Sequence, residues 1–226
     1  MGSMAVGGMT IERWRLGAWA GLVGALAAIG YAGRAESGTP DDDVLYQYET
    51  AIGGVIVYLV LLTLVLAIAR GLPQREVFAL RRPRSWPRAL GLALAGYITI
   101  FLGAGLLLWA LDATEEQGLT PEAWDSSKAG AYAANFVAVA LVGPVVEELL
   151  YRGAGMTFFG GFGSATAVGV TAVAFGLGHG LLLALPALVF FGLVTGVLRL
   201  RTRSLYPCVL VHCAFNATSL ILAVAV

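Results

Sequence analysis

Ionisable side chains are rare in the apolar parts of this chain, and they gather in three short segments. Glu147, Glu148 and Arg152 lie in VEELLYRG, and the only two histidines, His179 and His212, lie in AFGLGHG and VHCAFN. Carboxylates and imidazoles can act as general bases or acids near neutral pH when their surroundings tune them. Because an ionisable group inside hydrocarbon costs about 2.5–3.5 kcal/mol, each of these residues is a functional candidate.

The spacing of the two acids predicts different roles for them. On a helix that turns by about 100° per residue, Glu148 and Arg152 share one face, whereas Glu147 points about 100° away from Glu148. We therefore expect Glu148 to pair with Arg152 and to fix the helix. Glu147 is then free to face a cavity, where a desolvated carboxylate without a cation beside it is suited to act as base or acid.

Two further side chains lie one helical turn from the histidines. Phe175 precedes His179 by four residues, so its ring can pack over the imidazole on the same face. Asn216 follows His212 at the same spacing, and together they place two polar side chains on one stripe. Each histidine alone is explained as a hydrogen-bonded core residue. The three segments together are better explained as one functional site.

The elements that position these residues are predicted to be membrane spans. Of the 226 residues, 58% are hydrophobic and 12% are charged, whereas soluble proteins have about 45–50% and about 25%. This composition excludes a soluble single domain. The net charge is zero, with 14 basic and 14 acidic residues, and no basic stretch suggests a nucleic-acid partner. Cys208 and Cys213 share one apolar run, which predicts reduced, buried thiols.

About seven windows are apolar and charge-free over lengths that approach the roughly 20 residues needed to cross a bilayer. They predict an all-α polytopic membrane helical bundle of about seven transmembrane helices. The windows are Leu16 to Gly33, Thr50 to Ala69, Ala89 to Leu111, a run from about Ala131 that ends in the charged Glu147, Ser164 to about Leu183, Pro186 to Leu198 and Leu205 to Val226.

The distribution of arginine predicts a cytoplasmic N-terminus, since basic residues are retained on the cytoplasmic side. Arginines gather before the first window, between the second and third, and between the sixth and seventh, while the loops after the first and third windows are acidic. This pattern favours a multi-pass protein of a cell membrane, such as a bacterial inner membrane, with lipids as partners. The basic connector 73–87 either lies along anionic lipid or, more simply, is a solvated loop.

The motifs EELLYR, FGLGH and HCAFN fit EExxxR, FxxxH and HxxxN, in that order and on successive late windows. This series resembles the CAAX-protease and bacteriocin-processing (CPBP, or Abi) family of intramembrane proteases, which includes CAAX prenyl proteases of type 2. The resemblance covers about residues 131–220. It implies an intramembrane endopeptidase that acts on membrane-associated proteins or peptides.

The resemblance also implies roles for individual residues. Glu147 would activate the water together with His179, and His212 with Asn216 would form the oxyanion site. Supporting roles fall to Glu148 and Arg152, with Phe175 in the middle motif. The chain then divides into a tail at 1–15 that begins with a segment resembling a cloning remnant, three accessory spans at 16–111, and a four-helix catalytic core at 112–226.

Two versions of this chemistry stay open. A zinc ion could be held by Glu147, His179 and His212, since catalytic zinc usually takes three protein ligands. That arrangement would use Glu147 as a ligand and leave only Glu148, already paired with Arg152, as the base. We therefore favour a glutamate-activated water without a metal or cofactor, with zinc as the alternative.

Two other function classes use the same residues differently. A proton-coupled transporter could relay protons through the buried acids and histidines, although no inverted repeat or pair of broken helices is found in the sequence. A non-catalytic membrane scaffold or immunity factor could retain the site without using it. Peptide cleavage that depends on Glu147 would distinguish the protease from both.

Overall fold

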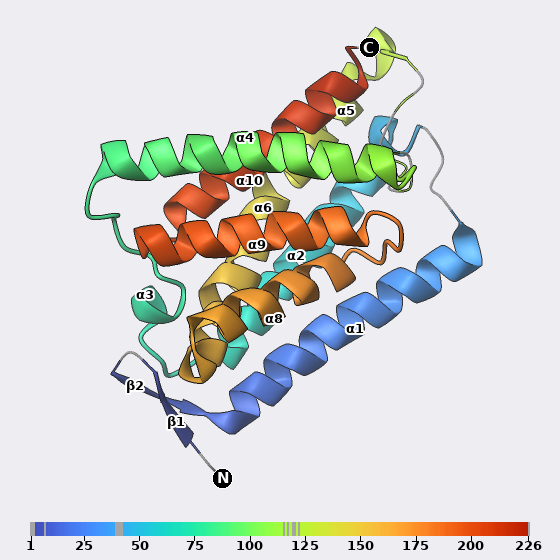
Figure 1. Cartoon of the computed structure of the whole chain (residues 1–226). Helices are drawn as coiled ribbons and strands as arrows, with labels where there is room; N and C mark the ends of the chain where they lie inside the picture. The colour runs from blue at the N-terminus through green and yellow to red at the C-terminus, as the bar shows by residue number, and fades with distance from the viewer. Residues whose placement is uncertain are drawn as a thin grey trace.

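The computed structural model describes residues 3–6, 8–38, 43–114, 116, 118, 121 and 123–225. It confirms the predicted helical bundle, and six of its helices are long and apolar enough to cross a membrane. Figure 1 shows the elements in chain order. They are β1 (Ser3–Val6), β2 (Met9–Glu12), α1 (Arg13–Ser37), η1 (Val44–Tyr46), α2 (Tyr48–Ile68), α3 (Gln74–Val77), α4 (Trp86–Ala110), η2 (Ser126–Lys128), α5 (Ala129–Val137), η3 (Ala138–Val142), α6 (Gly143–Glu148), η4 (Leu149–Gly155), α7 (Met156–Phe158), η5 (Phe159–Phe162), α8 (Ser164–Leu177), α9 (Leu185–Thr202) and α10 (Tyr206–Ala223).

Each predicted window contains a helix, but the fifth is shorter than expected. The helix α8 ends at Leu177 after 14 residues, which corresponds to about 21 Å, and a turn follows before α9. The seven windows thus correspond to six candidate spans and one shorter apolar helix. The orientation of these helices across the membrane stays a prediction.

The fourth window becomes the longest helical run, from Ser126 to Phe162 over 37 residues. Two π-helical segments, η3 and η4, interrupt it on either side of α6. Pro144 near the start of α6 has no N–H to bond the carbonyl four residues earlier, and a wider π turn accommodates that loss. The windows alone predicted a plain α-helix here.

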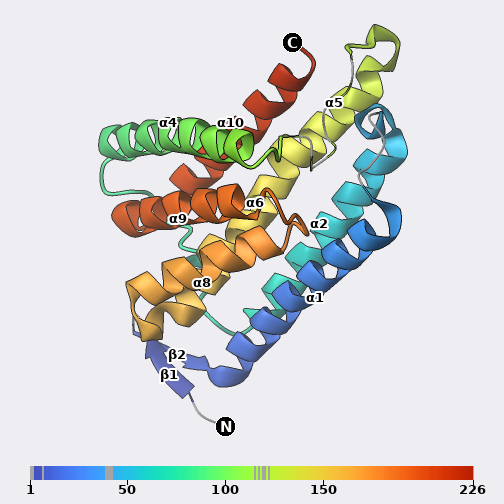
Figure 2. The same cartoon turned by 45° about the vertical axis from the view of Figure 1, so that its right-hand side comes forward.

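In two views α4, α9 and α8 lie side by side in one layer, with α10 and the α5–α6 run behind them and α1 along one edge (Figures 1 and 2). Small residues allow the helices of this layer to approach closely. A Cβ at Gly192 of α9 would come within 2.7 Å of the Cα of Ala172 in α8. Close approach at small residues is typical of helix packing inside membranes.

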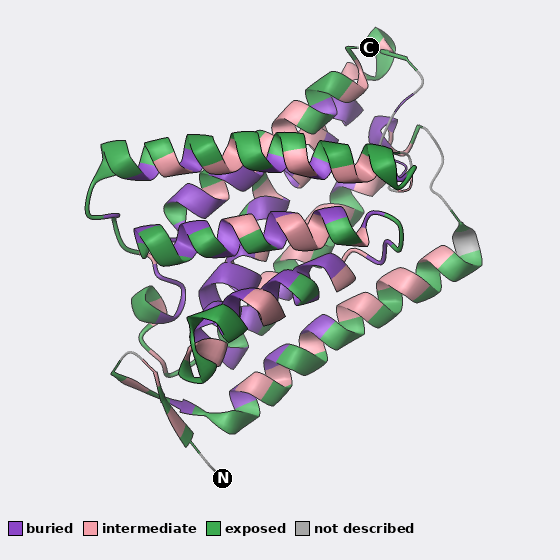
Figure 3. Cartoon of the chain, in the orientation of Figure 1, coloured by how far each residue is buried: buried purple, intermediate pink, exposed green. Residues whose placement is uncertain are grey.

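Figure 3 shows buried positions on the inner faces of the helices and many exposed positions on their outer faces. The exposed outer positions include large apolar side chains such as Ile52, Leu59, Leu94 and Leu102. Apolar side chains on the outside are expected where lipid, and not water, surrounds a helix.

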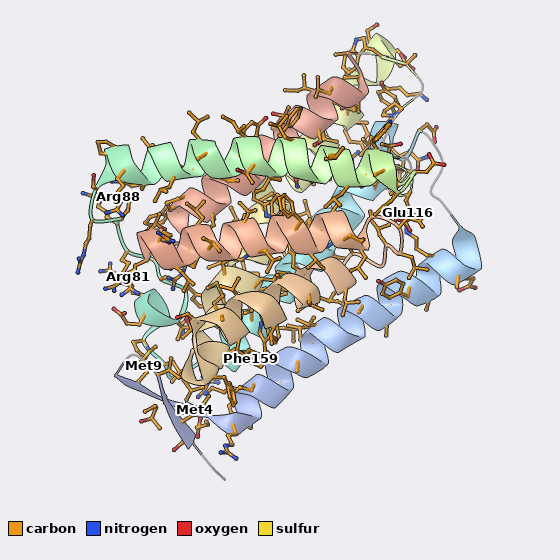
Figure 4. The ribbon with its side chains drawn as sticks, viewed as in Figure 1. Met4, Met9, Arg81, Arg88, Glu116 and Phe159 are labelled. Atoms are coloured by element: carbon orange, nitrogen blue, oxygen red, sulfur yellow. The ribbon has the colours of Figure 1, made fainter. Side chains whose placement is uncertain are left out.

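The N-terminal segment forms a β-hairpin, for which the sequence analysis predicted only a tail. Residues Ser3 and Val6 of β1 pair with Glu12 and Met9 of β2, and Gly8 in the turn has φ +84°, as hairpin turns require. Figure 4 shows Met4, Met9 and Phe159 at this corner of the molecule. The hairpin therefore packs beside the end of the long helical run.

The connection between α9 and α10 is buried inside the bundle. Ser204 and Leu205 are 0% and 2% exposed, and the Leu205 N–H donates to the carbonyl of Ala79 at 3.1 Å. This burial starts α10 below the surface of the bundle. From this start, α10 carries His212 to its contact with Glu148.

Candidate active site

The buried ion pair predicted between Glu148 and Arg152 is present. Arg152 Nη1 lies 3.2 Å from Glu148 Oε1, and both side chains are 0% exposed. The guanidinium also lies 4.5 Å from the centre of the Phe175 ring, a favourable position for a cation over an aromatic face. This arrangement neutralises both charges in a region that water does not reach.

Glu148 also contacts His212, which the spacing did not predict. His212 Nδ1 lies 3.0 Å from Glu148 Oε1, and His212 is 3% exposed. An ionised carboxylate only accepts hydrogen bonds, so the proton of this bond belongs to Nδ1. The Nε2 atom of His212 is then directed to the other side of the ring, where it lies 3.8 Å from Glu147 Oε2.

Glu147 differs from Glu148 in its surroundings, as the spacing predicted. Its side chain is 17% exposed and it lines a cavity, whereas Glu148 is completely buried. Its Oε2 atom has no hydrogen-bond partner among the described residues. Glu147 is therefore the carboxylate of the pair that can meet a water molecule or a substrate.

His179 lies in the turn directly after α8 and lines the same cavity as Glu147. Its Nδ1 atom lies 2.8 Å from the carbonyl oxygen of Phe175. A carbonyl only accepts, so Nδ1 carries the proton of this bond, and Nε2 of the neutral ring is free to accept a proton or a hydrogen bond.

The Phe175 ring lies between the two histidines. Its centre is 4.6 Å from that of His179 and 5.7 Å from that of His212. Phe191 of α9 also packs against His212, with ring centres 4.7 Å apart, and stacks on Phe175 with ring centres 5.3 Å apart. Phe175 thus packs against both imidazoles, and Phe191 packs against that of His212.

The π segments supply carbonyl groups that side chains from other helices bind. Asn216 donates through Nδ2 to the carbonyl of Val139 in η3 at 2.9 Å, and Trp19 of α1 donates through Nε1 to the carbonyl of Leu150 in η4 at 2.8 Å. A π turn disturbs the regular bonding of carbonyls within the helix, and π segments are frequent at functional sites. These two hydrogen bonds hold the helical run that carries Glu147 in place.

The cavity at the site has a volume of about 340 Å³ and is bounded by α1, α2, the α5–α6 run and the turn after α8. It extends from Glu147 and His179 towards Thr50 near the start of α2. Most of its wall is apolar. Val57, in the middle of α2, lines it and is 52% exposed, so the cavity reaches the lateral surface of the bundle.

Residues 129–218 match the family model described as "Type II CAAX prenyl endopeptidase Rce1-like". The chain contains an Rce1-like domain. All seven predicted site residues lie within the match, which agrees closely with the range of the resemblance. No curated protein and no solved structure matches the chain. This match suggests an intramembrane protease with protein substrates, in a multi-pass membrane protein.

Tyr58 reaches the site from outside the Rce1-like domain, and the sequence analysis missed it. Its hydroxyl lies 3.3 Å from Glu147 Oε1, to which it can donate, and its ring lines the cavity. The ring fits against α6 because position 143 is glycine, where a Cβ would come within 2.6 Å of Tyr58 Cζ. Neither charge nor a motif marks Tyr58. The glycine one turn before Glu147 is the only sequence signal of a close neighbour.

The turn that carries His179 is also held by hydrogen bonds to residues outside the Rce1-like domain. Glu116, which follows α4 by six residues and is labelled in Figure 4, accepts backbone N–H bonds from residues 182–184 at 2.6–3.0 Å. Partial burial would raise the pKa of Glu116, but these three bonds and the nearby Arg34 outweigh it, so the pKa is lowered. Tyr31 of α1 donates to the carbonyl of Leu181 at 3.1 Å.

The proposed zinc ligands Glu147, His179 and His212 do not form a recognised metal-binding group in the described part of the chain. Among the described residues, no group of three His, Cys, Asp or Glu side chains is close enough to hold a metal ion. His212 Nδ1 bonds Glu148 and His179 Nδ1 bonds the Phe175 carbonyl, so Nε2 of each ring stays available, as it also would in a histidine that binds zinc. The metal-free mechanism and the zinc alternative therefore both stay predictions.

Proposed function

We propose that this protein is an intramembrane endopeptidase, resident in a bacterial inner membrane, that hydrolyses peptide bonds of membrane-associated proteins or peptides with water activated by Glu147. One observation carries the proposal. Glu147 is a carboxylate with an unbonded Oε2 atom at a cavity wall, 3.8 Å from His212 Nε2 and beside His179 in the same cavity.

The reaction begins with a water molecule between Glu147 and His179. Glu147 takes a proton from this water as the oxygen attacks the carbonyl carbon of the scissile bond. The carbonyl oxygen becomes an oxyanion beside His212 and Asn216. Glu147 then returns the proton to the leaving nitrogen as the carbon–nitrogen bond breaks, which gives one carboxylic acid and one amine.

The surrounding residues hold the groups that act. Glu148 fixes His212 through Nδ1, so His212 offers an Nε2–H to the oxyanion when both ring nitrogens carry protons. Asn216 uses one N–H on Val139, which leaves its second N–H for the oxyanion. Preorganised donors of this kind are typically worth about 2.7–4 kcal/mol each in the transition state.

The position of the cavity supports entry of the substrate from the bilayer. Val57 lies in the middle of a candidate span and connects the cavity with the outer face of α2. A substrate segment within the membrane could therefore reach Glu147 without crossing the bundle. The apolar wall suits an apolar substrate segment, whether peptide or lipid-modified peptide.

The proposed function is tested by comparing protein termini in cells that carry the wild type or Glu147→Gln. A new N-terminus within a membrane-associated protein, present only with the wild type, is the expected result. Identical termini in the two cell lines, with a phenotype that survives Glu147→Gln, would instead support the scaffold. A change in ion flux without new termini would support the transporter.

Replacing Tyr58 by phenylalanine is expected to lower kcat about tenfold and to leave KM within about twofold. The change removes only the hydroxyl that donates to Glu147 Oε1, and hydrogen bonds to charged groups are worth about 1.5–3 kcal/mol. Steady-state kinetics on a substrate found by the comparison of termini measures both constants.

The matched control is Tyr97→Phe, because Tyr97 also lies in a candidate span and bonds Thr218 Oγ1 at 2.8 Å, away from the cavity. It should leave both constants unchanged. An unchanged kcat in Tyr58→Phe, or an equal loss in the two variants, would remove Tyr58 from the positioning of Glu147.

Hydrolysis is expected to continue when zinc is removed. Purified protein treated with a membrane-permeant zinc chelator should keep its activity, and elemental analysis should find far less than one zinc ion per chain. His212→Ala should lower the rate by about 10²- to 10³-fold as the loss of an oxyanion donor. Stoichiometric zinc that disappears in His179→Ala and His212→Ala would make the protein a metalloprotease.

A further inference from the structure

A second cavity, of about 320 Å³, lies between the first turn of α4 and the last turn of α9. It shares no lining residue with the active-site cavity. Figure 4 shows Arg81 and Arg88 at this end of the bundle, and Glu116 at the other end of α4. Since α4 is a candidate span, this cavity lies at one of the two membrane surfaces.

Four arginines from two separate segments of the chain line this cavity. Arg84 lies just before α4 and Arg88 in its first turn, while Arg201 lies in the last turn of α9 and Arg203 directly after it. None of the four forms an ion pair with a described residue, and no described lining residue is acidic. Four like charges around one hollow repel each other, so an anion there is strongly favoured.

The chain segments that carry these arginines are fixed in place. The carbonyl of Arg203, a residue with left-handed φ +54°, accepts a bond from Arg81 Nε at 2.7 Å. The next part of the connection is tied to Ala79 through the Leu205 N–H, and the floor residues Pro83, Ala89 and Thr202 are buried. The hollow is therefore a formed site and not a chance cluster on mobile loops.

An apolar stripe leads from the arginines into the membrane. Leu200 lines the cavity and is 36% exposed, and Val197 and Leu193 are 45% and 39% exposed. Their spacings of three and four residues place all three on one side of α9. A ligand that fits this combination has an anionic head and an apolar chain.

We propose that this cavity binds the phosphate group of an anionic phospholipid, with an acyl chain along Leu200, Val197 and Leu193. Guanidinium groups bind phosphate oxygens through paired hydrogen bonds, and the N-terminus of α4 adds a partial positive charge at the same place. The bound lipid bridges the connector before α4 and the end of α9. This site is independent of the proposed protease activity.

The test measures lipid binding to the full chain in detergent by native mass spectrometry. Phosphatidylglycerol and phosphatidylcholine with identical acyl chains are supplied at equal concentrations, and one phosphatidylglycerol per chain should be retained preferentially. Arg88→Gln with Arg201→Gln should weaken its binding about 25-fold, since each basic side chain near a lipid surface contributes about fivefold. The single Arg88→Gln should weaken it about fivefold.

The control is Arg13→Gln with Arg75→Gln, two exposed arginines outside the cavity with the same total change of charge. It should alter the affinity for phosphatidylglycerol less than twofold. An equal loss of affinity in both double variants would show a diffuse attraction between positive charge and lipid and would overturn the site. Equal retention of the two lipids would also overturn it. If inorganic phosphate binds as tightly as phosphatidylglycerol, and Leu200→Gln does not change lipid binding, the cavity is a site for a free anion. That result would refute the proposed binding of a phospholipid.

Discussion

Replacing Glu147 by glutamine is expected to lower peptide hydrolysis by about 10²- to 10⁴-fold and to leave the protein folded. Glutamine has the same shape and can still accept the bond from Tyr58, but it cannot take a proton from water. Glu147 is in no ion pair with Arg or Lys among the described residues, so its loss leaves no buried cation unpaired. Initial rates and the thermal unfolding midpoint in detergent measure the two effects.

The matched control is Glu49→Gln, which removes an exposed acid from the first turn of α2. It should have the wild-type rate. If Glu147→Gln keeps more than half of the wild-type rate, another group must be the base, and the proposed mechanism fails.

Replacing Glu148 by glutamine is expected to lower the free energy of unfolding by about 3–5 kcal/mol. The change leaves Arg152, which is 0% exposed, as an unpaired cation above the Phe175 ring. The yield of folded protein and the thermal unfolding midpoint should both fall. Glu147→Gln is the matched comparison, because the same substitution one residue earlier should affect the rate and not the stability.

A double variant tests whether the unpaired charge of Arg152 causes the expected loss of stability. Arg152→Leu combined with Glu148→Gln removes both charges, and it should recover much of the lost stability because no unpaired cation is left in the core. Its activity should stay low, since His212 Nδ1 has lost its carboxylate partner. Equal stability and equal activity of Glu147→Gln and Glu148→Gln would contradict the different roles of the two acids.

The meeting of the three polar segments could be predicted from the sequence, because polar groups inside a membrane must face each other or a cavity. The pairing of Glu148 with Arg152, the contact of Phe175 with His179 and the placement of Glu147 at a cavity followed from helical spacing alone. Spacing could not show that Glu148 also holds His212, since that contact joins two different helices.

Three features of the fold have weaker sequence signals. A charge-free run does not show where a helix ends, so α8 was predicted to extend past Leu177 to about Leu183. Pro144 indicates an irregular turn but not that the turn is a π-helix. Tyr58 is an uncharged residue in an apolar span, and only the folded chain places it 3.3 Å from Glu147.

The accessory helices also contribute more to the site than the motifs indicate. Trp19 and Tyr31 of α1 bind carbonyls on the segments that carry Glu147 and His179, and Tyr58 of α2 contacts Glu147 itself. All three lie outside residues 129–218. The Rce1-like domain is therefore completed by helices that its family model does not cover.

The central claim is tested most directly by cleavage in water enriched in ¹⁸O, with purified protein in lipid vesicles and a peptide that spans the identified cleavage site. The account predicts two products, with one ¹⁸O atom in the new carboxyl terminus after a single turnover, from the wild type and not from Glu147→Gln. Cleavage at the same rate by Glu147→Gln, or no cleavage by the wild type, would contradict hydrolysis by a water that Glu147 activates.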